Sequence, residues 1–184
     1  MKKLFYILFL FSFSLFSQNY NLITKANKIL NSENPNLIKA EKLLNRAEKR
    51  DYGFCGNAKM SADSEIEFLR AKILFLKNDF EKCLKRLESE DIWIRRYSSD
   101  SLKIECLIKM HNKETISNLI FAKSSEILKR KPNYNYKGVC IKLEEINYEF
   151  CFLDQHENIN YKKEVTLLEI LTETNFYNLI KPSD

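Results

Sequence analysis

Residues 71–83 read AKILFLKNDFEKC, a sequence typical of two helices joined by a tight polar turn. Apolar residues recur at helical spacing on both sides of Asn78-Asp79, and this polar pair interrupts the pattern. The small side chains of Ala71 and Cys83 allow two paired helices to approach closely, and Leu87 is large enough to fill the groove between them. The sequence therefore predicts a helical hairpin that turns at Asn78-Asp79.

Further helices are predicted on both sides of this hairpin. Four more stretches have apolar residues at helical spacing: 19–31, 37–47, 92–110 and 116–128. A last pair of helices is predicted over 139–153 and 161–179. No segment shows the sustained alternation of apolar and polar residues that is typical of a strand. The expected fold class is therefore all-α.

The central hairpin resembles the core of a tetratricopeptide repeat. Asn78-Asp79-Phe80 stands at the turn, where this family often has Gly-Asp-Tyr. Ala71 and Cys83 stand at the small positions, the second of which is usually Ala, and Leu87 stands at a large one. The resemblance is clearest over residues 66–90. It implies a short α-solenoid, a fold that usually binds peptides or other proteins on its concave face.

A weaker copy of this pattern lies thirty-four residues further along the chain, which is the period of the family. Asn112-Lys113-Glu114 marks the turn, Ser117 the small position and Phe121 the large one. Three residues depart from the preferences of the family: Glu67, Arg70 and Glu105. With an earlier unit matched around residues 36–44, the resemblance covers residues 19–130.

The first seventeen residues predict export. Lys2 and Lys3 precede an apolar run from Leu4 to Phe16, and Ser17-Gln18 marks the switch to polar sequence. This order is typical of a cleavable signal peptide, and the run of ~13 residues is shorter than the ~20 that a membrane span needs. We expect residues 1–17 to be removed, no stable membrane insertion afterwards, and a periplasmic or secreted protein. An uncleaved anchor is the alternative.

The mature chain is expected to form one compact domain, with tetratricopeptide-like hairpins over residues 18–131 and a C-terminal helical hairpin over residues 132–184. The formal net charge, +5 for the whole chain, is too small and too evenly spread to indicate a nucleic-acid partner. Three glycines provide no phosphate-binding loop. Pairs such as Glu41-Lys42 are expected on solvated helix faces. The Phe-Ser-Gln cut site and the abundance of Lys and Asn are similar to those of Bacteroidota proteins.

The chain has an odd number of cysteines, which leaves at least one outside any intramolecular disulfide. They are Cys55, Cys83, Cys106, Cys140 and Cys151. Cys83 and Cys106 fall on neighbouring predicted helices and are the candidate disulfide, although buried thiols are the favoured alternative. Cys140 and Cys151 would lie ~16 Å apart along one continuous helix, beyond disulfide reach. The sequence has no CxxC and no histidine at ligand spacing from a cysteine, so no metal site is expected.

The sequence contains no nucleophile elbow, no HExxH and no P-loop. His111 is expected at a helix end, where the helix dipole favours a cation, and His156 in a polar turn. Glu145 and Glu149, four residues apart, are expected to share a solvated helix face. We therefore predict a non-enzymatic protein without a cofactor, and a small helical hydrolase is the enzymatic alternative.

The segment from Ile92 to Tyr97 is the candidate binding surface. It combines Trp93, Arg95, Arg96 and Tyr97, residue types that dominate binding hot spots. The alternative is that Trp93 and Tyr97, four residues apart, fill the seam between two hairpins. The expected partner is another protein, and the oligomeric state does not follow from the sequence. The chain is then an adaptor or scaffold of an envelope complex, or an immunity protein that neutralises a toxin in the periplasm.

Overall fold

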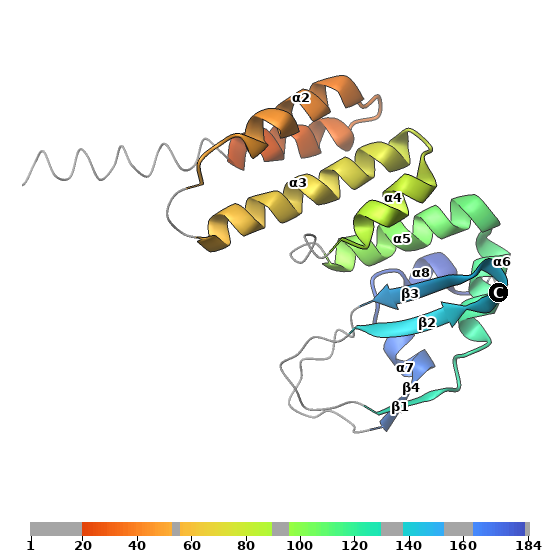
Figure 1. Cartoon of the computed structure of the whole chain (residues 1–184). Coiled ribbons are helices and arrows are strands. Elements are labelled where there is room, and N and C mark those ends of the chain that lie inside the picture. Colours follow the sequence, from red (N-terminus) through yellow and green to blue (C-terminus); the bar gives the residue numbers. More distant parts are fainter. Residues whose placement is uncertain (1–19, 53–55, 90–95, 130–137, 153–163, 183–184) are drawn as a thin grey trace, which may run out of the picture. The chain divides into compact units, whose positions relative to one another are not determined.

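The computed structural model describes residues 20–52, 56–89, 96–129, 138–152 and 164–182. The chain divides into two compact units, Met1–Arg95 and Arg96–Asp184, called unit 1 and unit 2 below. Most described residues are helical, as predicted (Figure 1). Within these ranges, no helix combines the length and the apolarity needed to cross a membrane.

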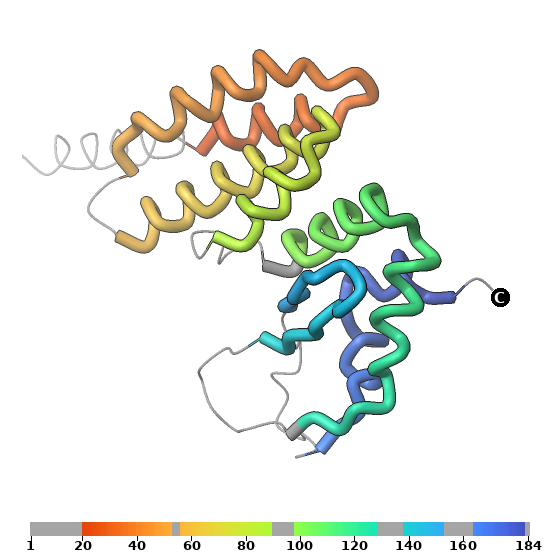
Figure 2. The backbone as a smooth tube through the Cα atoms, turned by 45° about the vertical axis from the view of Figure 1, so that its right-hand side comes forward, coloured from red at the N-terminus to blue at the C-terminus, as the bar shows by residue number. Residues whose placement is uncertain are grey.

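Unit 1 consists of two successive helical hairpins. Residues 20–30 and α2 (Leu37–Glu48) form the first, and α3 (Gly56–Leu76) and α4 (Phe80–Leu87) form the second. α3 packs against both α2 and α4, and α2 lies on the outer side of the unit (Figure 1, Figure 2). The predicted helical hairpin at Asn78-Asp79 is confirmed.

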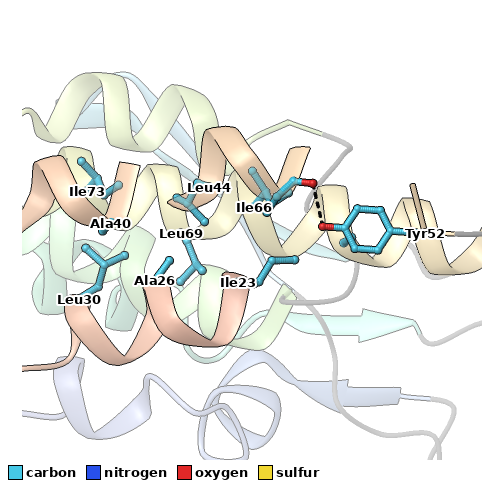
Figure 3. Packing of buried hydrophobic residues seen from close by; sticks show 11 residues of the cluster. Ile23, Ala26, Leu30, Ala40, Leu44, Tyr52, Ile66, Leu69 and Ile73 are labelled. Carbon is cyan, nitrogen blue, oxygen red and sulfur yellow. Dashed lines mark hydrogen bonds between the residues drawn. The ribbon is translucent and has the colours of Figure 1, made fainter. Parts of the chain in front are cut away.

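The core of unit 1 combines small and large apolar residues (Figure 3). Its alanines are fully buried, so the helices that carry them can approach their neighbours closely. The larger residues fill the remaining space at the density of a protein interior. The cluster consists of Ile23, Ala26, Leu30, Ala40, Leu44, Ala47, Tyr52, Ala62, Ile66, Leu69 and Ile73.

Unit 2 begins with a helical hairpin and continues into a mixed region. α5 (Arg96–His111) packs against α6 (Lys113–Phe121). The elements that follow are β1 (Ile127–Lys129), β2 (Val139–Leu143), β3 (Tyr148–Phe152), β4 (Glu164–Thr166), α7 (Leu167–Leu171) and α8 (Tyr177–Ile180). β1 pairs with β4 and β2 pairs with β3, and both pairs are antiparallel.

The prediction of a helix over residues 139–153 is wrong, because this segment folds as the β2–β3 hairpin. Ile141 and Leu143 on β2 are buried, as are Phe150 and Phe152 on β3. The residues between them are more exposed. Residues two apart share one face of a strand, whereas in a helix they point in different directions. The hairpin therefore buries one face of a small sheet.

Two more predicted helices differ in the structure. One is shorter than expected, and the other is replaced by several short elements. The helix expected over 116–128 ends at Phe121, and Ile127-Leu128 belongs to β1. In the described part of residues 161–179, β4, α7 and α8 stand where one helix was expected. The coarse prediction of a mostly helical chain is confirmed, but strands in unit 2 take the place of the expected C-terminal helical hairpin.

Each of the two main hairpins has an Asn with a positive φ at its turn. Asn78, between α3 and α4, has a φ of 60°, and Asn112, between α5 and α6, has a φ of 68°. Asn adopts a positive φ more readily than most residues that have a side chain. After the first turn, Asp79 N–H donates to the Leu74 carbonyl at 3.0 Å. After the second, the Asn112 side chain accepts from Thr115 N–H at 2.9 Å.

Replacing Gly138 with Ala should destabilise unit 2 by about 1–3 kcal/mol. A Cβ at this position would lie 2.6 Å from the Phe152 carbonyl oxygen, which belongs to the backbone and cannot rotate away. Gly56→Ala is the matched control, because nothing lies within 4 Å of that Cβ position. It should leave stability unchanged or slightly higher. Urea unfolding followed by circular dichroism compares the variants, and a Gly138→Ala protein as stable as the wild type would contradict this packing.

Candidate binding surfaces

The segment predicted to bind a partner falls largely outside the described residues. Trp93 and Arg95 belong to the range 90–95, which the structure does not describe. Arg96 and Tyr97 are the first two residues of α5, so their backbone is helical, but their side chains are not described. The binding role of this segment therefore stays a prediction.

An ion-pair network centred on Arg70 connects three helices of unit 1. Arg70 on α3 donates to both carboxylate oxygens of Glu48 on α2, at 2.8 and 3.0 Å, and to Asn45 at 3.0 Å. Glu67, one turn earlier on α3, accepts from Arg70 and also from Arg86 of α4. A two-pronged contact between guanidinium and carboxylate fixes orientation as well as distance. The network therefore holds α2, α3 and α4 in register.

This network also changes the acid–base properties of its members. The hydrogen bond from Arg70 lowers the pKa of the Glu48 carboxyl, and the same bond raises the pKa of Arg70. Glu67 and Arg70 are two of the residues that depart from tetratricopeptide preferences, and here they are partners at 3.0 Å. Each of the two also contacts a neighbouring helix, Arg70 through Glu48 of α2 and Glu67 through Arg86 of α4.

A second cluster in unit 1 surrounds Tyr52, which is only 4% exposed. The Tyr52 hydroxyl donates to the Ala47 carbonyl at 3.0 Å (Figure 3). Its ring packs edge to face on Tyr20, with centroids 5.4 Å apart, and Lys59 Nζ lies 5.7 Å from the ring centroid. Burial raises the pKa of Tyr52 to about 12, and Tyr20 and Asp63 add to this effect. Sequence reasoning missed the cluster because its members come from separate segments.

Unit 1 should lose stability as the pH rises from 10 toward 12. The folded state holds the pKa of Tyr52 above its ordinary value of 10.0. Its contribution to stability is therefore complete below pH 10 and disappears as the pH approaches 12. Urea unfolding measured across this range should show a smaller loss for Tyr52→Phe than for the wild type. The same loss in both proteins would show that Tyr52 is not responsible.

A disulfide joins Cys140 of β2 to Cys151 of β3. The two residues are direct cross-strand partners, with Cα atoms 4.0 Å apart. The prediction that they lie beyond disulfide reach is wrong, because it assumed one continuous helix. Cys83 and Cys106 are both buried thiols, so the candidate disulfide between them is not formed and the favoured alternative is confirmed. Cys55 lies outside the described residues.

Lys103 of α5 binds the edge of β3 beside this disulfide. Its ammonium group donates to the Cys151 carbonyl at 3.1 Å and to Asp100 Oδ1 at 3.3 Å. Only 12% of the Lys103 side chain and 7% of the Asp100 side chain are exposed, so both charges are largely withdrawn from water. When cross-strand Cα atoms are this close, the carbonyls point away from the partner strand, and Lys103 satisfies one of them. The contact ties α5 to the β2–β3 hairpin.

The remaining candidate residues occupy different elements. His111 is the last residue of α5, at a helix end as predicted, while His156 lies outside the described ranges. The prediction that Glu145 and Glu149 share a helix face is wrong, because Glu145 lies in a short 3-10 turn and Glu149 on β3 opposite Lys142. Across the part of the chain that the structure describes, no group of His, Cys, Asp or Glu residues could hold a metal ion.

Comparison with known protein families, with characterised proteins and with solved structures yields no match. The function is therefore inferred from the residues and the geometry of the chain itself.

Proposed function

We propose that this chain is an exported, non-enzymatic module that binds another protein through tetratricopeptide-like hairpins. The proposal depends on two features that recur at one spacing, an Asn with a positive φ between paired helices and a small buried residue after it. Asn78 and Asn112 both have a positive φ, stand thirty-four residues apart and lie between paired helices. Five residues after each, a small side chain is buried, Cys83 on α4 and Ser117 on α6. This spacing is the period of the family that the sequence resembles.

The packing of α3 against α4 supports the same proposal. Ala71 and Cys83 are fully buried, and Leu87 is only 3% exposed. Small residues at the contact allow a close approach, and a large one fills the groove beside it. Repeat proteins built from such hairpins usually bind extended or helical segments of other proteins, a function that needs no catalytic residue.

Export is part of the proposal, and two observations support it. The sequence begins like a cleavable signal peptide, and a Cys140–Cys151 disulfide is of the kind that persists in oxidising compartments. N-terminal sequencing of the protein from a periplasmic extract should give Gln18 as the first residue. Met1 on membrane-bound protein would contradict export with cleavage.

Cross-linking of the full chain in its own host, followed by reciprocal capture, tests the binding function. We expect one partner protein that recovers the chain in return. Replacing Arg95 and Arg96 with Ala should weaken capture at least tenfold, about 1.4 kcal/mol, and leave the circular dichroism spectrum unchanged. A toxin as partner would favour an immunity protein, and an envelope component would favour an adaptor.

Two outcomes of this experiment would count against the proposal. Failure to recover any protein reciprocally would contradict the binding function itself. Loss of helicity in the double variant would assign Arg95 and Arg96 to the core, so the binding surface would then lie elsewhere.

A further inference from the structure

The charges of α2 are sorted onto two sides of the helix. Glu41 and Glu48 are seven residues apart, which is about two helical turns, and so lie on one side. Both pair with cations, Glu48 with Arg70 of α3 at 2.8 Å and Glu41 with Lys77, which directly follows α3, at 3.7 Å. The acidic side of α2 is therefore already occupied by α3.

The other side of α2 is basic and exposed. Lys39, Lys42 and Arg46 recur at spacings of three and four residues, and Lys49 continues the row as the C-terminal cap of the helix. All four side chains are exposed, and within the described ranges none of them forms an ion pair. The row extends ~15 Å along the helix. We call these four residues the basic row.

Ile38 gives the basic row one apolar contact point. Its side chain is 70% exposed and stands one helical turn before Lys42. The residues of α2 that pack into the core are Ala40, Leu44 and Ala47. Ile38 is therefore not part of the core packing of unit 1, and it can contact a partner that lies along the basic row.

We propose that the basic row docks an acidic segment of the partner protein, with Asp or Glu at matching spacing and one apolar residue against Ile38. This inference rests on the proposed protein-binding function and names the chemistry of the partner. The observation that supports this proposal is the distribution of charge on α2. Arg70 and Lys77 pair with the two carboxylates of α2, so the cations of the row remain for a partner of opposite charge.

Other acidic surfaces fit this side of α2 less well. The core-facing apolar residues of α2 are already packed, so the helix has no apolar face to insert into a bilayer. Without an apolar face beside it, a row of four cations would contact an anionic lipid surface through charge alone, and vesicle binding is therefore the competing outcome of the test below. Nucleic acid binding needs more neutralised phosphates than this short row can contact, and the net charge of the whole chain is only +5.

A fluorescein-labelled acidic peptide, with Glu at three- and four-residue spacing and one Leu, is the probe that tests this inference. Fluorescence anisotropy with the full chain should show binding that weakens as the salt concentration rises. The variant K39E/K42E/R46E should bind at least tenfold more weakly. The control K109E/K113E/K181E makes the same change in net charge at exposed positions of unit 2, and it should bind within twofold of the wild type.

Several results would overturn the inference. They are unchanged affinity in K39E/K42E/R46E, equal weakening in the control, and tighter binding to phosphatidylglycerol vesicles than to the peptide. If circular dichroism shows that K39E/K42E/R46E is not folded, K39Q/K42Q/R46Q replaces it, and that variant should still bind at least threefold more weakly. In the capture experiment, undiminished capture of the partner by the α2 variant would refute this inference and leave the binding function standing.

Discussion

Replacing Lys103 with Met should lower the free energy of unfolding of unit 2 by about 3 kcal/mol. Lys103 and Asp100 are both largely buried, so the substitution leaves a buried carboxylate with one cation fewer. The Cys151 carbonyl also loses a hydrogen-bond donor. Breaking a buried pair costs far more than the contribution of a typical surface pair. Urea unfolding followed by far-UV circular dichroism measures the change.

Lys109→Met is the matched control, because Lys109 is exposed on the same helix. It should change stability by less than about 0.5 kcal/mol. The double variant Lys103→Met/Asp100→Asn should be more stable than the sum of its single changes predicts, since a neutral amide does not need the cation. A Lys103→Met protein as stable as the control would show that this pair does not hold α5 to β3.

Reduction of the Cys140–Cys151 disulfide should cost unit 2 about 3 kcal/mol. The bond links residues with a sequence separation of 11, and breaking it returns conformational entropy to the unfolded chain. Cys140 is exposed, so a small dithiol can reach the bond. The urea midpoint should fall when dithiothreitol is added, and alkylation followed by mass spectrometry should confirm that the bond has opened.

The variant Cys140→Ala/Cys151→Ala is the control for this experiment. It should match the reduced wild type in stability and should not respond further to dithiothreitol. An unchanged midpoint in wild-type protein that mass spectrometry shows to be reduced at both positions would contradict the stabilising role of the disulfide.

Apolar periodicity was sufficient for the helical hairpins of unit 1 but not for the β2–β3 hairpin. Val139, Leu143, Ile146 and Phe150 recur at spacings that fit one face of a helix. The structure uses a different pattern, in which residues two apart face the core and pair across a turn at Asn147, where φ is 49°. Strand register depends on this pairing, which the periodicity of one segment does not specify.

The charge distribution on α2 has the same kind of origin. In the sequence Glu41 adjoins Lys42 and Glu48 adjoins Lys49, so each pair reads as a mixed, solvated face. The pairing of the two carboxylates with Arg70 and Lys77 appears only when α3 packs against α2. The disulfide was missed for a similar reason, because its prediction required the strand register.

The volume of the side chain at position 83 distinguishes a tetratricopeptide-like hairpin from a helical hairpin without close packing at this position. Cys83 is fully buried on α4, at a position where the family usually has Ala. In urea unfolding, Cys83→Ala should stay within about 1 kcal/mol of the wild type, whereas Cys83→Leu should overpack the hairpin and cost about 1–3 kcal/mol. Lys85→Leu, which adds the same side chain at an exposed position of α4, should be nearly neutral. Equal stability of Cys83→Ala and Cys83→Leu would contradict close packing of the hairpin at this position.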